Sequence, residues 1–251
     1  MAAAKRVAMV TGAGSGIGKS AALAFLKDGY HVALVGRRKD MLQKTADESG
    51  AKERALVLAA DITKDAEVAS VFEQIKTKWG RLDVLFNNAG IGAPAVPMDE
   101  LPIEKFREVV NINLVAMFMC TQHAMRIMKA QSPKGGRIIN NGSISAHAPR
   151  PMSVAYTSTK HAVTGLTKCI SLDGRKDDIT ASQIDIGNAL TELAARMANG
   201  VPQADGSIKP EPLMDVKHVG DAVLHMANLP LDVNVQFMTI MATKMPFVGR
   251  G

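Results

Sequence analysis

The sequence has 251 residues, with 47% hydrophobic and 22% charged side chains and a formal net charge of +6. This composition is typical of a globular chain that can form one large domain, and it excludes extended disorder; no apolar run approaches the roughly 20 residues that a transmembrane helix needs, so we expect no membrane partner. The positive charge is scattered along the chain and only 4% of the residues are aromatic, so we expect no nucleic-acid partner and a small anionic ligand instead.

Short apolar runs alternate with longer helical patterns along the chain. The predicted strands lie at Val7–Val10, His31–Val35, Ala55–Ala59, Val84–Phe86, Arg137–Asn140, Ala181–Ile186 and Phe237–Met241. The predicted helices lie near residues 17–28, 39–49, 65–79, 103–130, 153–174 and 216–228. Near-continuous apolar strands separated by helices are typical of a parallel sheet that is covered on both faces. The pattern therefore predicts one α/β domain over residues 1–251, a Rossmann-type doubly wound parallel sheet of about seven strands.

The N-terminus and the cysteines both indicate an intracellular location. The first strand follows Lys5 and Arg6 directly and is too short for the apolar region of a secretory signal, so we expect a cytoplasmic protein. Cys120 and Cys169 lie far apart in apolar helical contexts. This spacing predicts two buried, reduced thiols, and we expect no metal site.

Residues 188–215 interrupt the alternation of strands and helices. They contain several glycine, proline and asparagine residues, with a short helix predicted over Leu190–Met197. An irregular segment after a late strand lies beyond the carboxyl ends of the strands, where open α/β sheets bind ligands. Because long loops in compact domains are usually functional, we interpret residues 188–215 as a substrate lid, with an ordinary surface loop as the alternative.

A glycine-rich turn directly follows the first predicted strand. It reads Thr11-Gly12-Ala13-Gly14-Ser15-Gly16-Ile17-Gly18. Glycines let the backbone turn sharply and approach a pyrophosphate, and the N-terminus of the next helix offers free N–H groups and a favourable dipole. The spacing is T-G-x-x-x-G-x-G, not the generic G-x-G-x-x-G, but its place between a strand and a helix predicts a dinucleotide site.

The end of the second strand predicts which dinucleotide binds. NAD enzymes usually carry an acidic residue about 20 residues after the turn for the ribose 2′-hydroxyl. Here the strand is followed by Arg37 and Arg38, and the first carboxylate is Asp40. Guanidinium groups bind phosphate, which a carboxylate would repel. We therefore predict NADP as cofactor, with NADPH preferred over NADH and Arg37 at the 2′-phosphate; the alternative is that both arginines are merely solvated.

Further motifs follow in order along the chain. They are Asp61, Asn87-Asn88-Ala89-Gly90, Asn113 in Asn-Ile-Asn-Leu, Ser143 in Gly-Ser-Ile-Ser, and Tyr156 and Lys160 in Tyr-Thr-Ser-Thr-Lys. With the glycine turn, this set resembles the short-chain dehydrogenase/reductase family over residues 7 to 191, with its TGxxxGxG and YxxxK motifs. Residues 192 to 251 match only in general layout, as expected of a region that varies with the substrate.

The resemblance implies which residues bind the cofactor. Asp61 would contact the adenine edge, and residues 87–90 would line the adenosine side; for the latter, a strand end stabilised by amide hydrogen bonds is a compatible structural reading. The implied cofactor contacts are Gly12, Ser15, Gly16, Ile17, Gly18, Arg37, Arg38, Asp61, Ile62, Asn88, Ala89, Gly90, Tyr156, Lys160, Gly187, Ala189 and Thr191.

Tyr156 and Lys160 are the predicted centre of the chemistry. Their spacing of four places both on one face of a helix. A free tyrosine has a pKa of about 10, and a neighbouring ammonium together with the positive nicotinamide of the oxidised cofactor favours the phenolate, so we expect a lower pKa. In reduction Tyr156 would protonate the carbonyl oxygen, and in oxidation it would act as the base.

Two polar residues complete the catalytic set that the resemblance implies. Ser143, at the end of the fifth strand, would hydrogen-bond the substrate oxygen, with Ser145 as the rival assignment. By resemblance, Lys160 also binds the nicotinamide ribose, and Asn113 holds a water that links Lys160 to solvent. The alternatives for Asn113 are a helix-interior amide that bends its helix, and Asn111 as the functional asparagine. The catalytic set is therefore Asn113, Ser143, Tyr156 and Lys160.

One segment departs from the family's pattern. The family usually has Pro-Gly after the sixth strand, whereas this chain has Ile186-Gly187. Gly187 and Thr191 remain, so contacts to the nicotinamide carboxamide are still expected. The loss of proline frees φ and restores an N–H, so we expect a less rigid loop. Nearby, His147 and Arg150 follow the Ser143 strand at the rim of the predicted pocket. We expect a structural or surface role for His147; the alternative is that either residue contacts a polar substrate, and Arg150 a carboxylate.

The sequence therefore predicts an oxidoreductase that transfers a hydride between NADP(H) and a small-molecule carbonyl or alcohol. The alternatives are a catalytically silent NADP-binding regulatory module, expected to lose the tyrosine or lysine, and an enzyme that epimerises or dehydrates a nucleotide sugar, expected to be longer. The helices near 103–130 and 153–174 resemble those through which the family dimerises, and the apolar tail Met241–Val248 offers a second contact. We expect a homodimer or homotetramer.

Overall fold

The computed structural model describes residues 5–191 and 200–248, and its centre is a parallel sheet of seven strands. The strands are β1 (Val7–Thr11), β2 (His31–Gly36), β3 (Ala55–Ala59), β4 (Val84–Asn87), β5 (Gly136–Asn141), β6 (Ile179–Gly187) and β9 (Phe237–Met241). Their order across the sheet is β3-β2-β1-β4-β5-β6-β9, and every neighbouring pair is parallel. The predicted doubly wound sheet is confirmed.

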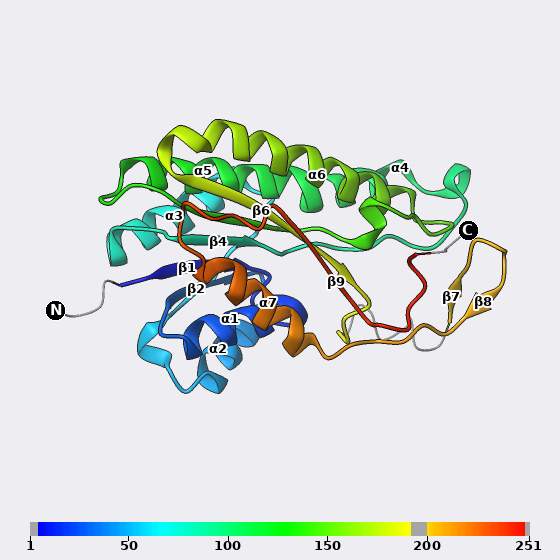
Figure 1. The fold of residues 1–251 in the computed structure, drawn as a ribbon, viewed down its shortest axis with the longest axis horizontal. Helices are drawn as coiled ribbons and strands as arrows, with labels where there is room; N and C mark the ends of the chain where they lie inside the picture. Colours follow the sequence, from blue (N-terminus) through cyan, green and yellow to red (C-terminus); the bar gives the residue numbers. More distant parts are fainter. Residues whose placement is uncertain (1–4, 192–199, 249–251) are drawn as a thin grey trace.

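The helices form one layer on each face of the sheet (Figure 1). One layer contains α1 (Gly16–Lys27), α2 (Lys39–Glu48) and α7 (Val216–Asn228). The other contains α3 (Asp65–Trp79), α4 (Ile103–Val110), α5 (Ala116–Ala130) and α6 (Val154–Gly174). Short 3₁₀ turns occur at η1 (Lys52–Arg54), η2 (Met98–Glu100), η4 (Ile144–Ala146) and η5 (Arg175–Asp177). The chain winds from β1 first toward β3 and then back past β1 toward β9, which opens the sheet's carboxyl edge between β1 and β4.

The strands are apolar on both sides because a core lies on each face of the sheet. In β1, Ala8 and Val10 join the core formed with α1, α2 and α7. Val7 and Met9 alternate with them and join the core formed with α3, α5 and α6. Successive side chains of a strand point to opposite faces of the sheet. A strand that lies between two helical layers therefore needs apolar residues at odd and even positions alike.

The predicted helix near 103–130 contains a π-helical segment between α4 and α5. This segment, η3, spans Asn111–Val115. Within it, the buried Asn113 amide makes two hydrogen bonds to the backbone of Ile91: its Oδ1 accepts from the N–H at 2.8 Å, and its Nδ2 donates to the carbonyl at 3.0 Å. π-Bulges occur frequently at functional sites. The continuous helix from α4 to α5 therefore changes its pitch at Asn113, the residue that binds Ile91 in the segment after β4.

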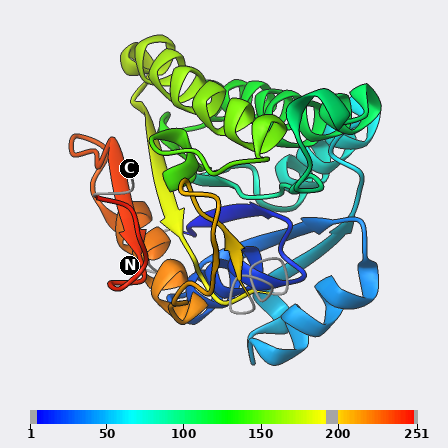
Figure 2. The same cartoon turned by 90° about the vertical axis from the view of Figure 1, so that its right-hand side faces the viewer.

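The predicted lid contains a small hairpin. Strands β7 (Val201–Pro202) and β8 (Ile208–Lys209) pair antiparallel. The hairpin projects beyond the carboxyl edge of the main sheet, and Figure 2 views the molecule from this end. Most of the short helix predicted over Leu190–Met197 lies outside the described residues.

The C-terminal segment folds back onto the body of the protein. Ala242 and Met245 are buried beside Ile144, in a small third apolar cluster. Of the two cysteines, Cys120 is buried and burial raises its pKa to about 12, but Cys169 is exposed. The prediction of two buried thiols is therefore wrong for Cys169, which lies on the solvent side of α6. In the part of the chain that the structure describes, no helix is long and apolar enough to cross a bilayer.

Candidate active site

A cleft of about 1070 Å³ lies at the carboxyl edge of the sheet. It extends from the glycine turn to Tyr156 and reaches the β7 end of the hairpin. Its volume exceeds the range of about 300–1,000 Å³ that is usual for one small ligand, so it has room for a dinucleotide together with a substrate. The cleft lies where the strand order reverses, which is the binding position of open α/β sheets.

The glycine turn forms one wall of the cleft. Gly12 has φ +68° and Gly16 has φ +51°, both in the left-handed region that favours glycine. A side chain at Gly18 would place its Cβ 2.2 Å from the Gly12 carbonyl oxygen, so only glycine lets α1 begin this close to the turn. The N-cap of α1, Ser15, makes no side-chain cap hydrogen bond. The first N–H groups of α1 are therefore free to bind an anion.

Hydrogen bonds between Thr11 and Asn88 join the carboxyl ends of β1 and β4. The Thr11 Oγ1 accepts from the N–H groups of Asn88 at 2.9 Å and Ala89 at 3.0 Å, and Asn88 Nδ2 donates to the Thr11 carbonyl at 2.8 Å. These bonds satisfy backbone groups that have no strand partner beyond the point where β1 and β4 diverge. The asparagine after β4 therefore stabilises the strand end, as the structural reading of residues 87–90 predicted, and lines the cleft as well.

The far end of the cleft carries two arginines and an aspartate. Arg37 and Arg38 both line the cleft, and Arg38 donates to Ser15 Oγ at 3.2 Å. Burial by itself raises the pKa of Asp61, but hydrogen bonds from the Thr63 N–H and hydroxyl, together with the charge of Arg37, hold this pKa below its ordinary value. Asp61 is therefore a fixed carboxylate at neutral pH, close to the Arg37 guanidinium.

These features fit a nicotinamide dinucleotide. The uncapped N-terminus of α1 lies where a pyrophosphate would bind, and the absence of side chains at Gly12 and Gly16 lets the backbone approach it. Arg37 and Arg38 provide positive charge at the end of the cleft that lies beyond this turn. The lining at the turn consists of Gly12, Gly14 and Gly16 together with the side chains of Ser15 and Ile17.

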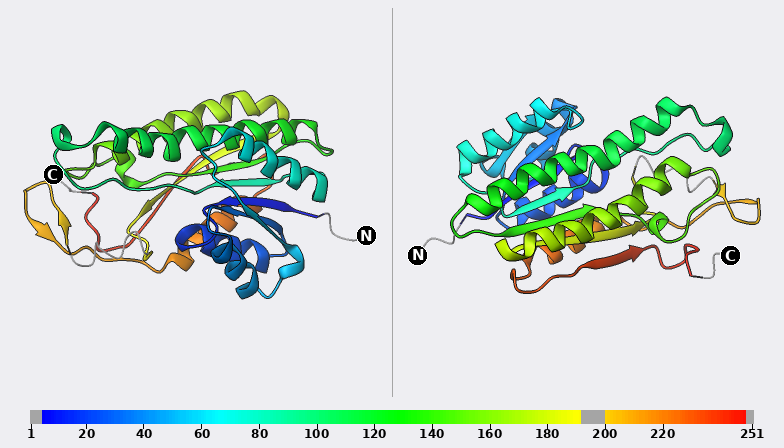
Figure 3. Two further views of the ribbon diagram at one scale, coloured as in Figure 1. Left: turned by 180° about the vertical axis from the view of Figure 1, so that it is seen from behind. Right: turned by 90° about the horizontal axis from the view of Figure 1, so that it is seen from above.

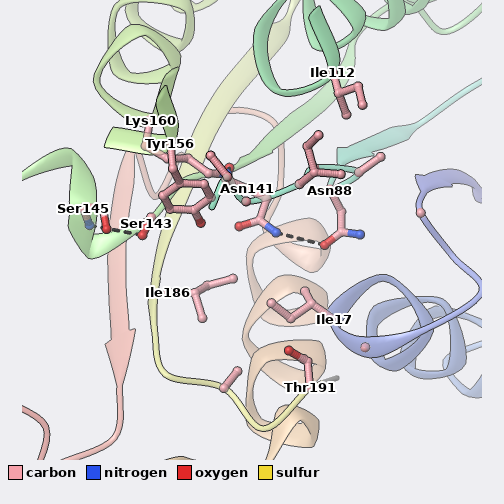
Figure 4. A pocket seen from close by; sticks show the side chains of 18 of the residues that line it. Ile17, Asn88, Ile112, Asn141, Ser143, Ser145, Tyr156, Lys160, Ile186 and Thr191 are labelled. Atoms are coloured by element: carbon pink, nitrogen blue, oxygen red, sulfur yellow. Dashed lines mark hydrogen bonds between the residues drawn. The ribbon is translucent and has the colours of Figure 1, made fainter. Parts of the chain in front are cut away.

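Tyr156 and Lys160 lie on α6 at the other end of the cleft (Figure 4). The Lys160 ammonium lies 5.4 Å from the centre of the Tyr156 ring and donates to the Asn141 carbonyl at 2.7 Å. Asn141 Nδ2 in turn donates to Asn88 Oδ1 at 2.9 Å. The sequence interpretation missed Asn141, although its position at the end of a central strand was a signal. Through it, the lysine is connected to the junction of β1 and β4.

Ser143 lies just beyond β5, at the start of η4. Its backbone is extended and its Oγ accepts from the Ser145 N–H at 3.1 Å, so Ser143 caps this short helix. The Ser143 hydroxyl proton is then free to be donated into the cleft, toward the same side as the Tyr156 hydroxyl (Figure 4). Ser145, the rival assignment, also lines the cleft and supports Ser143 through its backbone.

A buried carboxylate that sequence analysis missed lies behind Ser143. Asp185 in β6 is 1% exposed, and its Oδ1 accepts from the Ser143 N–H at 2.9 Å. Its Oδ2 lies 2.8 Å from Nε2 of His147, which does not line the cleft. The signal was an aspartate inside an otherwise buried strand, where an acidic side chain needs hydrogen-bond partners.

Arg150, which does line the cleft, is held by an ion pair within the protein. Its guanidinium pairs with the buried Glu211 and donates to Asn188 Oδ1 at 3.1 Å. Asn188 Nδ2 also donates to Glu211 at 2.7 Å, and Gln203 Nε2 donates to the other Glu211 oxygen at 3.0 Å. This network ties the loop after β6 and the hairpin segment to the floor of the cleft.

Most residues predicted for the site do line the cleft, and three lie behind it. The predicted residues in the lining are Gly12, Ser15, Gly16, Ile17, Arg37, Arg38, Asp61, Ile62, Asn88, Ala89, Gly90, Ser143, Tyr156, Lys160, Ala189 and Thr191. Gly18 packs against Gly12, and Gly187 packs beneath Met241 and Met245. Asn113 is bound to Ile91 and to Thr159 Oγ1 at 3.3 Å, whereas Asn111, the alternative, lines the cleft.

Comparison with known sequences places these motifs in one family. A family model described as short chain dehydrogenase matches residues 6–201. The dehydrogenase/reductase SDR family member 11 of Gallus gallus is 32% identical over 238 residues, which cover 92% of this chain and 93% of the relative.

Comparison with solved structures gives the same result. The actinorhodin polyketide ketoreductase with NADPH has a TM-score of 0.85 and 26% identity, with 96% of this chain and 98% of that chain covered. The 3-ketoacyl-(acyl-carrier-protein) reductase of Brucella melitensis complexed with NADH has a TM-score of 0.83 and 27% identity, with 94% and 96% covered. The similar folds therefore include proteins bound to either dinucleotide.

Replacing Gly18 with alanine should disrupt the glycine turn. The added methyl would lie 2.2 Å from the Gly12 oxygen and 2.5 Å from Asn88 Nδ2, so the turn must shift. Overpacking of this kind costs about 1–3 kcal/mol, and we expect at least ~10-fold weaker binding of NADPH and NADH in fluorescence titrations. Gly165→Ala on α6 is the matched control, since its methyl would meet no other atom of the same chain and should leave both affinities unchanged. Unchanged affinity in Gly18→Ala would refute the packing argument.

Proposed function

The chain belongs to the short-chain dehydrogenase family, whose members are oxidoreductases that use NAD(P)(H), and we propose that it transfers a hydride between NADP(H) and the carbonyl or alcohol group of a small molecule. The observation that carries this proposal is the arrangement of one cleft. It joins the glycine turn and Arg37 at one end to Ser143, Tyr156 and Lys160 at the other. A dinucleotide lying along the cleft would reach from the arginine to the tyrosine.

Each residue of the catalytic end has a distinct part in this proposal. The bound dinucleotide supplies the hydride in reduction and accepts it in oxidation. The Tyr156 hydroxyl donates its proton to the carbonyl oxygen in reduction and, as phenolate, removes the alcohol proton in oxidation. Ser143 donates a hydrogen bond to the same oxygen, and the Lys160 ammonium stabilises negative charge on the tyrosine oxygen.

Asn113 supports this proton path from outside the cleft lining. Its amide contacts Thr159 Oγ1, which in turn donates to the Tyr156 carbonyl at 2.8 Å. It also fixes Ile91, a residue of the lining, through both of its backbone groups. We therefore propose that Asn113 holds the Ile91 wall of the cleft in place.

The preference for NADP rests on the positive end of the cleft. Arg37 and Arg38 are exposed at the mouth, and no carboxylate follows β2 before Asp40. The charge of Arg37 contributes to lowering the pKa of Asp61, and the Asp61 Oδ1 is engaged by the N–H and hydroxyl of Thr63. The Arg37 guanidinium therefore remains able to bind a 2′-phosphate in a fork.

The substrate end of the cleft favours an uncharged molecule. Its walls include Ile91, Ile144, Met152 and Val201, all apolar. Arg150, which also lines the cleft, already has the buried Glu211 as its counterion. Two of the similar folds belong to enzymes named for ketone reduction. We propose a small, neutral ketone or secondary alcohol as substrate.

Tyr156→Phe should abolish turnover without loss of cofactor. The variant removes only the hydroxyl that exchanges the proton, so kcat should fall at least ~100-fold while the affinity for NADPH stays within about twofold. The assay follows NADPH absorbance with acetoin, ethyl acetoacetate and cyclohexanone, and with the corresponding alcohols and NADP. Undiminished activity in Tyr156→Phe would disprove the mechanism.

Arg37→Ala should remove most of the cofactor preference. A charge-assisted hydrogen bond is worth about 1.5–3 kcal/mol, so the variant should bind NADPH about 10- to 100-fold more weakly and NADH almost unchanged. Lys44→Ala on the exposed face of α2 removes one positive charge nearby and serves as the control. Equal affinities of the wild-type protein for NADPH and NADH would overturn the assignment to NADP.

We also propose that the protein is a homodimer or homotetramer. Phe118 on α5 is 50% exposed and Leu172 on α6 is 64% exposed, and both helices run along the same outer face (Figure 3, right). The edge strand β9 leaves a second open surface, with Phe237 exposed on it. Apolar side chains left exposed on these two surfaces are the candidates for burial between copies of the chain.

Light scattering should therefore give the wild-type protein a mass of two or four chains. Phe118→Glu places a charge in the α5–α6 face and should halve the mass, whereas Glu73→Gln on the exposed side of α3 should leave it unchanged. A monomeric wild-type protein would contradict the proposal.

A further inference from the structure

We infer that Asp185 is a positioning residue that sets the geometry of Ser143 for the reaction. The inference rests on the proposed function, because it assigns a task to a carboxylate that acts only through Ser143. Asp185 itself is buried in β6, and it does not line the cleft. What it holds is the backbone N–H of Ser143, with a hydrogen bond of 2.9 Å to Oδ1.

The chain leaves Asp185 room by having no side chain at position 142. A Cβ on Gly142 would lie 2.0 Å from Asp185 Oδ1 and 2.8 Å from Gln183 Cγ. Gly142 has an ordinary φ, so the backbone conformation does not require glycine there. The reason for glycine is the carboxylate that occupies this space. The turn from β5 into η4 is therefore shaped around Asp185.

A second set of contacts holds the carboxylate in place. Gln183 Nε2 donates to Asp185 Oδ1 at 2.8 Å and to Thr164 Oγ1 at 3.1 Å. The Gln183 Oε1 accepts from Thr167 Oγ1 at 3.3 Å, and Thr167 Oγ1 also accepts from Asn140 Nδ2 at 2.9 Å. This chain of hydrogen bonds anchors Asp185 to α6, the helix that carries Tyr156 and Lys160. Ser143 and Tyr156 are thus positioned from one buried network.

His147 completes the coordination of the carboxylate. With its proton on Nε2, the imidazole donates to Asp185 Oδ2 at 2.8 Å, while its outer face packs edge-on against the Phe247 ring. Asp185 thereby accepts three hydrogen bonds, which offset the cost of burying its charge. Two of the three come from the segment 143–147, so the carboxylate fixes both ends of the η4 turn.

The consequence for the reaction lies in the Ser143 hydroxyl. Its Oγ is held from one side by the Ser145 N–H, and its backbone from the other by Asp185. A donor must be aligned with the oxygen on which negative charge develops, and a displacement of about 1 Å can cost up to ~100-fold in rate. Asp185 thus keeps the Ser143 hydroxyl aligned with the substrate oxygen, the same oxygen to which Tyr156 donates its proton in the proposed reduction.

The test is a double-mutant cycle between Asp185 and Ser143. Asp185→Ala should lower kcat at least ~10-fold, with KM for the carbonyl probe changed less than about threefold. Asp185→Asn keeps an Oδ1 acceptor but loses the charge, so it should lower kcat about threefold. In a Ser143→Ala background both changes should alter kcat less than about twofold, because no hydroxyl remains to be aligned. The probe is whichever of acetoin, ethyl acetoacetate and cyclohexanone turns over fastest.

A readout without substrate checks the same contact. Amide hydrogen exchange over residues 141–147 should become faster in Asp185→Ala, because the Ser143 N–H loses its acceptor, while the affinity for NADPH stays within about twofold. Glu73→Gln removes an exposed carboxylate from α3 and should change neither measurement. If Asp185→Ala does not fold, the double-mutant cycle is measured with Asp185→Asn and Ser143→Ala.

Two outcomes would overturn the inference, and they differ in what else they contradict. Asp185→Ala could lower kcat by the same factor in the wild-type protein and in Ser143→Ala, or leave amide exchange at residues 141–147 unchanged. Either result would show that Asp185 serves only the fold. A Ser143→Ala variant with wild-type kcat would contradict the proposed function of Ser143, and the inference with it.

Discussion

The hydrogen bonds between Thr11 and Asn88 are the contacts on which the rest of the site depends. β1 and β4 are neighbours in the sheet, but the chain leaves them in opposite directions, so their ends separate and expose backbone groups. One threonine hydroxyl and one asparagine amide satisfy these groups at 2.8–3.0 Å. The cleft can stay open at this point because its edges are already hydrogen-bonded. The glycine turn and the Asn141–Lys160 contact are both placed from this junction.

Polar side chains that line the carboxyl edge are stabilised by each other. The carboxyl-terminal halves of β4, β5 and β6 carry Asn87, Asn140, Gln183 and Asp185, all of them buried. A buried polar group costs free energy unless it is hydrogen-bonded, and each of these four makes at least one hydrogen bond to another of them or to a threonine of α5 or α6. Side chains on adjacent parallel strands lie close enough for this because the strands are in register. The same register brings the catalytic end of the cleft together.

The loop after β6 shows how this chain restrains its backbone at the point where the family resemblance led us to expect a proline. Ile186 replaces it, and Asn188 adopts a left-handed φ of +54°. The Asn188 side chain is held by Arg150 and Glu211, so hydrogen bonds restrain a backbone that a proline ring would otherwise restrict. The sequence led us to expect a less rigid backbone here, but it did not indicate these contacts, because Glu211 lies more than twenty residues further along the chain.

The sequence by itself determined the sheet, its two helical layers, the glycine turn and the Tyr156–Lys160 pair. Each of these depends on local spacing: apolar runs, a strand-to-helix turn, or two residues four apart on a helix. The tertiary structure alone decided that Asp185 holds Ser143, that Glu211 pairs with Arg150, and that Asn113 lies behind the cleft. These contacts join residues 20 or more positions apart, and no local pattern encodes which distant group meets a given side chain. The exposure of Cys169 likewise depended on which side of α6 faces the sheet.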